Sequence, residues 1–195
     1  MHALLLFLLS CGDAEKQPAV ADCTNPEGST EIDWDCDPID PSRCILPFPS
    51  TFFMEETDQT PSGWQVTLGE TTIPKNIDLV QPTPDLFNEK DGFSPVTPLI
   101  THMPNATSAG LIGHEDIGAY ADPEATTVII DIETGERVPH FTELDMSTND
   151  ETQRMLIIHP VTPMRHGARY AVGIQGVVDS DGNPLPASEP FAALR

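Results

Sequence analysis

Residues 170–178 read YAVGIQGVV, and this run is the clearest strand signal in the chain. Similar runs of β-branched and apolar residues occupy Val96–His102, Thr126–Ile132 and Met155–His159. Gly, Pro, Asn and Asp separate the runs, and no long amphipathic helical pattern lies between them. Strands with this spacing are typical of an antiparallel sandwich, because βαβ units would need helices between the strands. We therefore predict an all-β fold, with an antiparallel β-sandwich over residues 96–195.

Two hairpin turns are predicted within this domain. Thr134-Gly135-Glu136 and Asp181-Gly182-Asn183 each lie between apolar runs and contain residues that tolerate tight-turn backbone angles. Asp179, Asp181 and Asn183 also offer the oxygen ligands that calcium prefers, so a weak calcium site is an alternative interpretation. We favour the simple turn, because its backbone alone explains these residue types. Residues 110–121 are expected to form either a short helix or a loop.

The composition excludes several classes of partner. The 195 residues carry 31 acidic and 9 basic side chains, which gives a net charge of −22. Nucleic acids and anionic lipids both require a basic face, so neither is an expected partner. The 20 prolines and 13 glycines are too many for a helical bundle. An acidic, turn-rich protein that binds no nucleic acid is the expected class.

The N-terminus carries an export signal. Residues 3–9 read ALLLFLL, which is too short to span a bilayer but matches the apolar region of a signal peptide. Leu8-Leu9-Ser10-Cys11 resembles the bacterial lipobox, in which the cysteine becomes the lipidated N-terminus of the mature protein. The resemblance implies that residues 1–10 are a lipoprotein signal peptide and that Cys11 carries fatty acyl chains such as palmitate. The protein is then exported and lipid-anchored to a membrane, at the outer membrane or cell surface.

Residues 11–45 form an acidic, Cys-containing segment. Its charge and scarcity of large apolar residues predict an extended, partly disordered tether. Export permits disulfides, and Cys23, Cys36 and Cys44 remain once Cys11 is acylated. Cys36 with Cys44 would close a short, proline-containing loop, and Cys23 with Cys36 is the competing pair. The sequence does not choose between them, and the spacings do not fit a zinc site.

Residues 46–95 form a proline- and aromatic-rich segment. The prolines within Ile45–Met54 exclude a helix and a central strand there, so we expect this patch to lie extended against the rest of the domain. Phe48, Phe52 and Phe53 are predicted to form an apolar docking surface or a seam between domains. Further along, Trp64–Leu68 alternates with period two, and Gly69-Glu70 suggests a turn into Thr71–Ile73, which together predict a small hairpin.

Four short motifs carry a resemblance to a known family. They are Asp91–Pro95 (DGFSP), Leu156–Pro160 (LIIHP), Gly167–Val172 (GARYAV) and Val178–Leu185 (VDSDGNPL). In this order they are similar to the N-terminal domain of bacterial virulence-factor lipases and to bacterial Ig-like surface domains, over residues 46–195. The resemblance implies an Ig-like sandwich that precedes an α/β-hydrolase domain in a longer, lipid-anchored chain.

No catalytic residue is expected within these 195 residues. A serine-hydrolase elbow needs Gly-x-Ser-x-Gly, and the nearest match places Pro95 and Val96 after Ser94. His166–Arg169 is interpreted as a turn, and Gly113–Asp116 groups an imidazole with two carboxylates but lacks the H-E-x-x-H pattern of a helical zinc site. The histidines that adjoin apolar runs are expected to be core or edge residues: His102, His140 and His159.

The chain's last residues predict a short helix. Ser188-Glu189-Pro190 is a favourable helix start, and Phe191–Arg195 continues with helix-forming residues before the sequence stops. The resemblance favours a chain truncated here. Taken together, the sequence predicts a non-catalytic, lipid-anchored Ig-like domain of a cell-envelope protein, the N-terminal part of a lipase- or esterase-like lipoprotein. The alternative is a free-standing, calcium-dependent surface adhesion or binding module; no other cofactor is expected.

Overall fold

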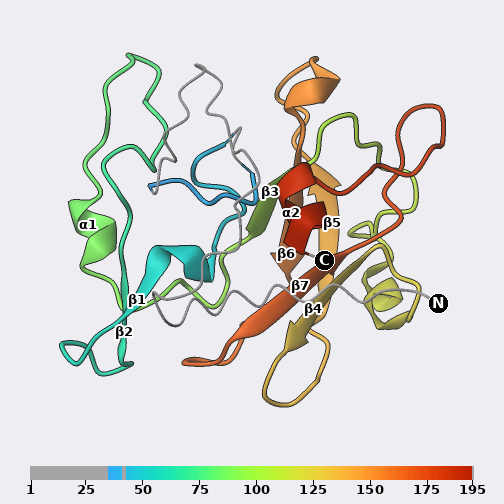
Figure 1. Cartoon of the computed structure of the whole chain (residues 1–195). Helices are drawn as coiled ribbons and strands as arrows, with labels where there is room; N and C mark the ends of the chain where they lie inside the picture. Colours follow the sequence, from blue (N-terminus) through green and yellow to red (C-terminus); the bar gives the residue numbers. More distant parts are fainter. Residues whose placement is uncertain (1–34, 41–42, 195) are drawn as a thin grey trace. The chain divides into compact units, whose positions relative to one another are not determined.

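The computed structural model describes residues 35–40 and 43–194 of the chain (Figure 1). These residues divide into two compact units. Unit 1 is Ser94–Pro186, and unit 2 comprises the described residues before Ser94 together with residues 187–194. The predicted boundary at residue 96 therefore lies close to the start of unit 1, whereas the final segment belongs to the other unit.

Unit 1 contains two antiparallel sheets (Figure 1). The first sheet has three strands in the order β3-β6-β5, and the second pairs β4 with β7. Two 3₁₀ helices, η2 and η3, lie in the connections. The element bounds are β3 Leu99–His102, η2 Ile117–Ala121, β4 Thr127–Asp131, β5 His140–Leu144, η3 Glu151–Gln153, β6 Met155–Pro160 and β7 Tyr170–Ile174.

One hydrophobic core joins the two sheets of unit 1. Leu156 and Ile158 alternate along β6 and are buried, as the period-two pattern of a half-buried strand requires. Ile129 of β4 belongs to the same cluster, and its register partner Val172 of β7 packs against it. Each fully buried aliphatic side chain contributes roughly 1.5–3 kcal/mol. The two sheets therefore stabilise each other through shared apolar contacts.

The predicted all-β class is confirmed, and each predicted run contains a strand. Strand β3 begins later than its predicted run, and strand β7 ends earlier than its predicted run. The Thr97 amide donates to the Ser94 carbonyl (3.0 Å), and this turn delays β3 until Leu99. After β7, Gly176 adopts a φ of +65°, which interrupts the strand, and Val178 forms only an isolated bridge with Pro184.

The sequence did not predict β5. His140 and Thr142 are the residues that this strand buries, while Phe141 between them is only half-buried. Polar side chains therefore occupy the inward positions, which hides the strand from a search for alternating hydrophobicity. The strand nevertheless pairs along its whole length with β6, from His140 opposite Pro160 to Leu144 opposite Leu156.

Both predicted hairpin turns are confirmed. At the first, the Asp131 amide donates to the Glu136 carbonyl (2.9 Å), and Gly135 adopts a φ of +73°. At the second, Gly182 has a φ of +82°, a conformation that disfavours residues with a Cβ. Residues 110–121 were expected to form a short helix or a loop, and the end of this segment forms the 3₁₀ helix η2.

Unit 2 is built from short elements around a small core. These elements are η1 Thr51–Phe53, β1 Met54–Glu56, β2 Trp64–Val66, α1 Asp85–Asn88 and α2 Glu189–Leu194. Strands β1 and β2 are antiparallel, with Met54 opposite Val66 and Glu56 opposite Trp64. The buried cluster consists of Phe53, Val66 and Leu68.

The predicted hairpin from Trp64 to Ile73 is wrong in its second strand. The partner of β2 is β1, which precedes it, and residues 69–73 remain a turn. The Gly69 amide donates to the Thr72 hydroxyl oxygen (2.9 Å), which folds the chain back on itself there. Thr72 is buried by this arrangement and does not join a sheet.

The predicted C-terminal helix is present as α2. The Ala192 amide donates to the Ser188 carbonyl (2.8 Å), so the helical hydrogen bonding starts where the sequence indicated. The Ser188 hydroxyl donates to the Ile39 carbonyl (3.1 Å), which ties the start of the helix to the N-terminal part of unit 2.

Candidate functional site

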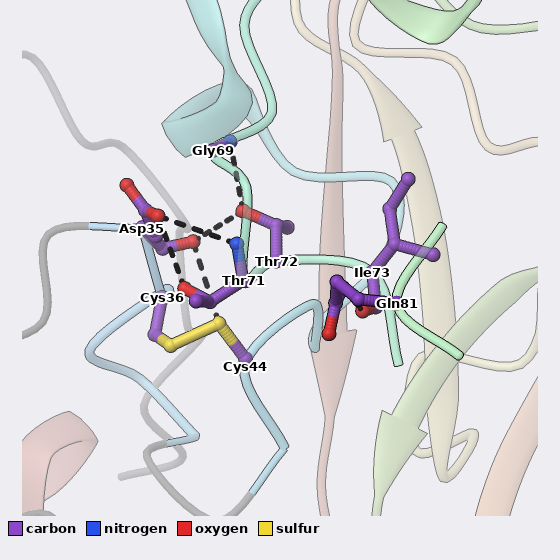
Figure 2. The surroundings of a disulfide bond; sticks show 8 residues. All are labelled: Asp35, Cys36, Cys44, Gly69, Thr71, Thr72, Ile73 and Gln81. Carbon is purple, nitrogen blue, oxygen red and sulfur yellow. Dashed lines mark hydrogen bonds between the residues drawn. A yellow bond between two sulfur atoms is a disulfide. The ribbon is translucent and has the colours of Figure 1, made fainter. Parts of the chain in front are cut away.

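A disulfide links Cys36 to Cys44 in unit 2 (Figure 2). The Cα atoms are 4.2 Å apart, and the Asp37 amide donates to the Cys44 carbonyl (3.0 Å) across the same loop. This is the shorter of the two pairings that the sequence allowed, and Cys23 lies outside the described residues. The loop belongs to the segment predicted to be a tether, whose described residues are part of unit 2.

Hydrogen bonds attach this loop to the turn at residues 69–72 (Figure 2). The Thr72 hydroxyl donates to the Asp35 carbonyl (2.6 Å), and the Thr71 hydroxyl donates to an Asp35 carboxylate oxygen (3.0 Å). A Cβ at Gly69 would overlap the Asp35 carboxylate, so a larger residue there would displace that side chain. The disulfide loop is thereby held against a segment more than thirty residues away in the sequence.

Asp37 is a fully buried carboxyl group within the same loop. It accepts hydrogen bonds from the Ile39 amide (3.0 Å) and the Ser50 hydroxyl (2.7 Å), while burial raises its pKa. Ser50 also accepts a hydrogen bond from the Phe52 amide (3.2 Å) and so caps η1. One oxygen of the Asp37 carboxyl group therefore bonds within the disulfide loop, and the other bonds to Ser50. The carboxyl group thus joins the disulfide loop to the proline- and aromatic-rich segment 46–95.

The predicted apolar docking surface or seam between domains at Phe48, Phe52 and Phe53 is wrong for Phe53. Its side chain is 1% exposed and lies at the centre of the unit 2 core. Phe52 packs edge-on against it, and Phe48 packs edge-on against Phe93, each with ring centroids 5.2 Å apart. The aromatic residues form a core because the η1 turn folds them towards β2, an arrangement that the prolines alone did not predict.

Most of the exposed apolar residues described in unit 2 lie elsewhere, in the connection between β2 and α1 and in α1 itself. Ile77 is 97% exposed, Leu79 78% and Val80 58%. Leu86 and Phe87 of α1 are also exposed. The sequence carried a signal for this surface, since residues 77–80 read IDLV within a proline-bounded loop.

An ion-pair cluster stabilises the first hairpin of unit 1. Arg165 donates from Nε to Asp131 Oδ2 (2.7 Å) and from Nη2 to Asp131 Oδ1 (3.0 Å), and Nη2 also reaches Glu133 (2.7 Å). The hydrogen bonds from Arg165 lower the pKa of Asp131 to about 2. The Arg165 amide donates to the Tyr170 hydroxyl oxygen (2.7 Å). The cluster therefore connects the end of β4 to the start of β7.

His140 is a core histidine, as the sequence predicted. Its side chain is completely buried, and burial lowers its pKa, so the imidazole is neutral. Nδ1 donates to the Val138 carbonyl (2.8 Å), and Nε2 accepts from the Thr127 hydroxyl (2.9 Å). Because Thr127 is in β4 and His140 is in β5, this hydrogen bond links the two sheets of unit 1.

The other two predicted core or edge histidines also have structural partners. His159 on β6 stacks on Phe141 of β5 with ring centroids 4.7 Å apart, and its Nε2 lies 2.9 Å from Glu143 Oε1. Nε2 of His102 lies 2.8 Å from the Thr152 carbonyl oxygen. Both side chains therefore sit in contacts that position strands and loops.

The remaining candidate residues lie in turns. The Ser94 hydroxyl accepts from the Val96 amide (3.4 Å), and His114 Nε2 lies 3.9 Å from Glu115 Oε1 on an exposed loop. His166 is an exposed turn residue. Within the described ranges, no group of three or more His, Cys, Asp or Glu residues gathers closely enough to hold a metal ion.

The predicted calcium ligands lie on the second hairpin turn. Asp179 Oδ1 accepts from the Asp181 amide (2.9 Å) and the Asn183 amide (2.8 Å). The hydrogen bond from the Asn183 amide is the largest of the contributions that lower the pKa of Asp179. These bonds are what a tight turn needs, and calcium binding at Asp179, Asp181 and Asn183 stays a prediction.

Three further observations bear on the function of the chain. Cys11, the predicted lipidation site, lies outside the described residues. None of the helices in the part of the chain that the structure describes has the length and apolar character needed to cross a membrane. Comparison of the chain with protein-family models, with curated proteins and with solved structures found no match. A function for this chain therefore has to be argued from its residues and their geometry.

Proposed function

We propose that this chain is an exported, non-catalytic β module held at the cell envelope by a lipid on Cys11. The observation that carries the proposal is the Cys36–Cys44 disulfide, because such bonds persist in oxidising compartments and are rare in the cytosol. The apolar residues 3–9 and the lipobox-like sequence ending at Cys11 support the same route out of the cell. A periplasmic or surface location follows from these features together.

The use of the polar groups supports a scaffold role. Asp37, Asp131 and His140 have shifted pKa values, which in many proteins mark active sites. Here each group holds a loop, a hairpin or two sheets together through hydrogen bonds within its own unit. The module therefore acts by presenting surfaces, and chemistry belongs to another part of the parent protein.

The parent protein is proposed to be a lipase- or esterase-like lipoprotein. The four motifs that resemble the N-terminal domain of virulence-factor lipases support this, and so does the arrangement of unit 1 in two antiparallel sheets around one core. We extend the proposal to an Ig-like sandwich for unit 1 on the same grounds. The chain would then form the N-terminal part of the longer protein.

Metabolic labelling tests the anchor. The full chain is expressed in a bacterial host that processes lipoproteins, in the presence of an alkyne-tagged palmitate analogue. We expect label in the membrane fraction for the wild-type chain and for the control Cys23→Ser, and none for Cys11→Ser. Equal labelling of Cys11→Ser, or an unlabelled wild-type chain, would refute the proposal.

A calcium-dependent binding module is the second candidate. Asp179, Asp181 and Asn183 lie on one exposed turn and offer the oxygen ligands that calcium prefers. Calorimetry with and without millimolar calcium tests this candidate. A rise in the melting temperature of the wild-type chain, lost in Asp179→Asn, would support it over a simple anchored scaffold.

A further inference from the structure

Three aliphatic side chains stand in solvent on one loop of unit 2. This surface, called the apolar tip below, consists of Ile77, Leu79 and Val80, which are 97%, 78% and 58% exposed. Single exposed aliphatic residues are ordinary on protein surfaces, but three within four positions form a cluster. The loop that carries them lies between β2 and α1 (Figure 1). The apolar tip therefore exposes more aliphatic surface in one place than is usual for a protein surface.

The backbone holds the apolar tip in a fixed conformation. Asn76 Oδ1 accepts from the amides of Asp78 (2.9 Å) and Val80 (2.9 Å). The Asn76 amide donates to the Val80 carbonyl (3.0 Å), and the Leu79 amide donates to the Asn76 carbonyl (2.9 Å). Four hydrogen bonds within residues 76–80 thus fix the backbone of the loop, and the three aliphatic side chains remain exposed to solvent.

Leu79 is the strained residue of this loop. Its φ of +62° lies in the left-handed region, which a bulky residue such as leucine rarely adopts. Glycine or asparagine would occupy the same position without that penalty. A strained leucine that remains 78% exposed indicates that its side chain serves something outside the folded unit.

A second pair of exposed apolar residues lies in α1, which follows this connection. Leu86 and Phe87 of α1 are 72% and 50% exposed. Asn88 fixes this helix, because its side chain donates to the Leu68 carbonyl (2.9 Å) and accepts from the Leu68 amide (2.8 Å). The helix is therefore held in place with these apolar side chains exposed.

The charges around the tip select its partner. Residues 54–93 contain eight acidic and two basic side chains, so this part of unit 2 repels anionic surfaces. A second copy of the chain carries the same net charge of −22 and is repelled as well. A zwitterionic lipid surface carries no net charge and needs no matching pocket, and Lys75 next to the tip can approach its phosphate groups. The observations therefore favour a neutral bilayer.

We infer that the apolar tip inserts into a zwitterionic lipid surface, that of the membrane to which the chain is anchored. The inference rests on the proposed lipid anchor at Cys11. Cys11 and Asp35 are only 24 positions apart, a distance of at most about 80 Å when fully extended. The anchor therefore keeps unit 2 close to the bilayer, so that weak insertion of a few side chains becomes effective. Insertion would fix which side of unit 2 faces the membrane.

Vesicle co-flotation of the unacylated chain that lacks the predicted signal peptide (residues 1–10) and carries Cys11→Ser tests the insertion separately from the anchor. The probe is phosphatidylcholine vesicles at millimolar lipid, and the variants are Ile77→Asp and Leu79→Asp. Met146→Asp in unit 1, where Met146 is 65% exposed, is the matched control because it adds the same charge at another exposed apolar residue. We expect each tip variant to lower the bound fraction about tenfold and the control to leave it unchanged.

Several outcomes would overturn the inference. Absence of binding by the wild-type chain, or equal binding by the tip variants, removes the basis for insertion. Stronger binding to vesicles rich in phosphatidylglycerol contradicts the charge argument. Self-association in sedimentation that is lost in Ile77→Asp identifies a second copy as the occupant. Tryptophan fluorescence during urea denaturation checks that each variant is folded. Failure of the palmitate labelling would refute the anchor without changing the vesicle result.

Discussion

Removal of the Cys36–Cys44 disulfide is expected to destabilise unit 2 and to leave unit 1 unchanged. The two cysteines are eight positions apart, so the bond closes a loop of nine residues. In the chain-entropy model, a loop of this size restricts the unfolded chain by an amount worth about 2.5 kcal/mol at 25 °C. The Cys36→Ser/Cys44→Ser double variant should therefore lose about 2.5 kcal/mol from the free energy of unfolding of unit 2.

The aromatic residues allow each unit to be observed separately. Both tryptophans, Trp34 and Trp64, belong to the part of the sequence assigned to unit 2, and both tyrosines, Tyr120 and Tyr170, belong to unit 1. With Trp34→Phe in every protein, urea denaturation followed by tryptophan fluorescence reports the surroundings of Trp64. Tyrosine absorbance difference spectra report unit 1.

The result has a matched control and two ways to fail. Cys23→Ser should leave both transitions unchanged. A loss smaller than about 0.5 kcal/mol in the fluorescence transition would refute the loop argument. An equal loss in the tyrosine signal would refute the assignment of the disulfide to one unit.

Three more predictions follow from individual contacts. Because the folded-state pKa of His140 is lowered from 6.5, the stability that this residue contributes to unit 1 is present above about pH 6.5 and is lost as the pH falls. Thermal melts followed by tyrosine absorbance from pH 7.5 to 5 should show this loss. The loss should be absent in His140→Gln. Gly69→Ala places a Cβ against the Asp35 carboxylate and should cost about 1–3 kcal/mol in the fluorescence transition of unit 2, whereas Gly63→Ala tests the effect of backbone angle without a close neighbour. Asp179→Ala removes the acceptor of the second hairpin turn and should lower the melting temperature of unit 1 equally with and without calcium; a loss seen only with calcium would favour the calcium-binding module.

The sequence predicted unit 1 well where apolar residues point inward. Leu156, Ile158 and Ile129 are buried, and they lie in short runs of apolar and β-branched residues that identify their strands directly. Strand β5 escaped prediction because its inward positions are His140 and Thr142, whose hydrogen bonds make them suitable for a core. These hydrogen bonds depend on partner groups outside the strand, so the sequence of β5 itself shows no pattern that would reveal the strand.

The sequence predicted unit 2 less well, because contacts distant in the chain determine it. The hydroxyl of Thr72 bonds to Asp35, 37 positions earlier, and this contact keeps residues 69–73 out of a sheet. Phe53 is buried because the η1 turn folds it onto Val66 and Leu68. Neither contact can be read from residue spacing. The apolar tip is different, since its aliphatic residues and flanking prolines are visible in the sequence.

The proposed function depends on a lipid at Cys11 that holds the chain at the envelope. Intact-mass and tandem mass spectrometry of the protein purified from the membranes of its native cell would detect this lipid. We predict an N-terminus at Cys11 with a diacylglyceryl group on its sulfur. A chain that still begins at Met1 and carries an unmodified Cys11 thiol would rule out the lipid anchor.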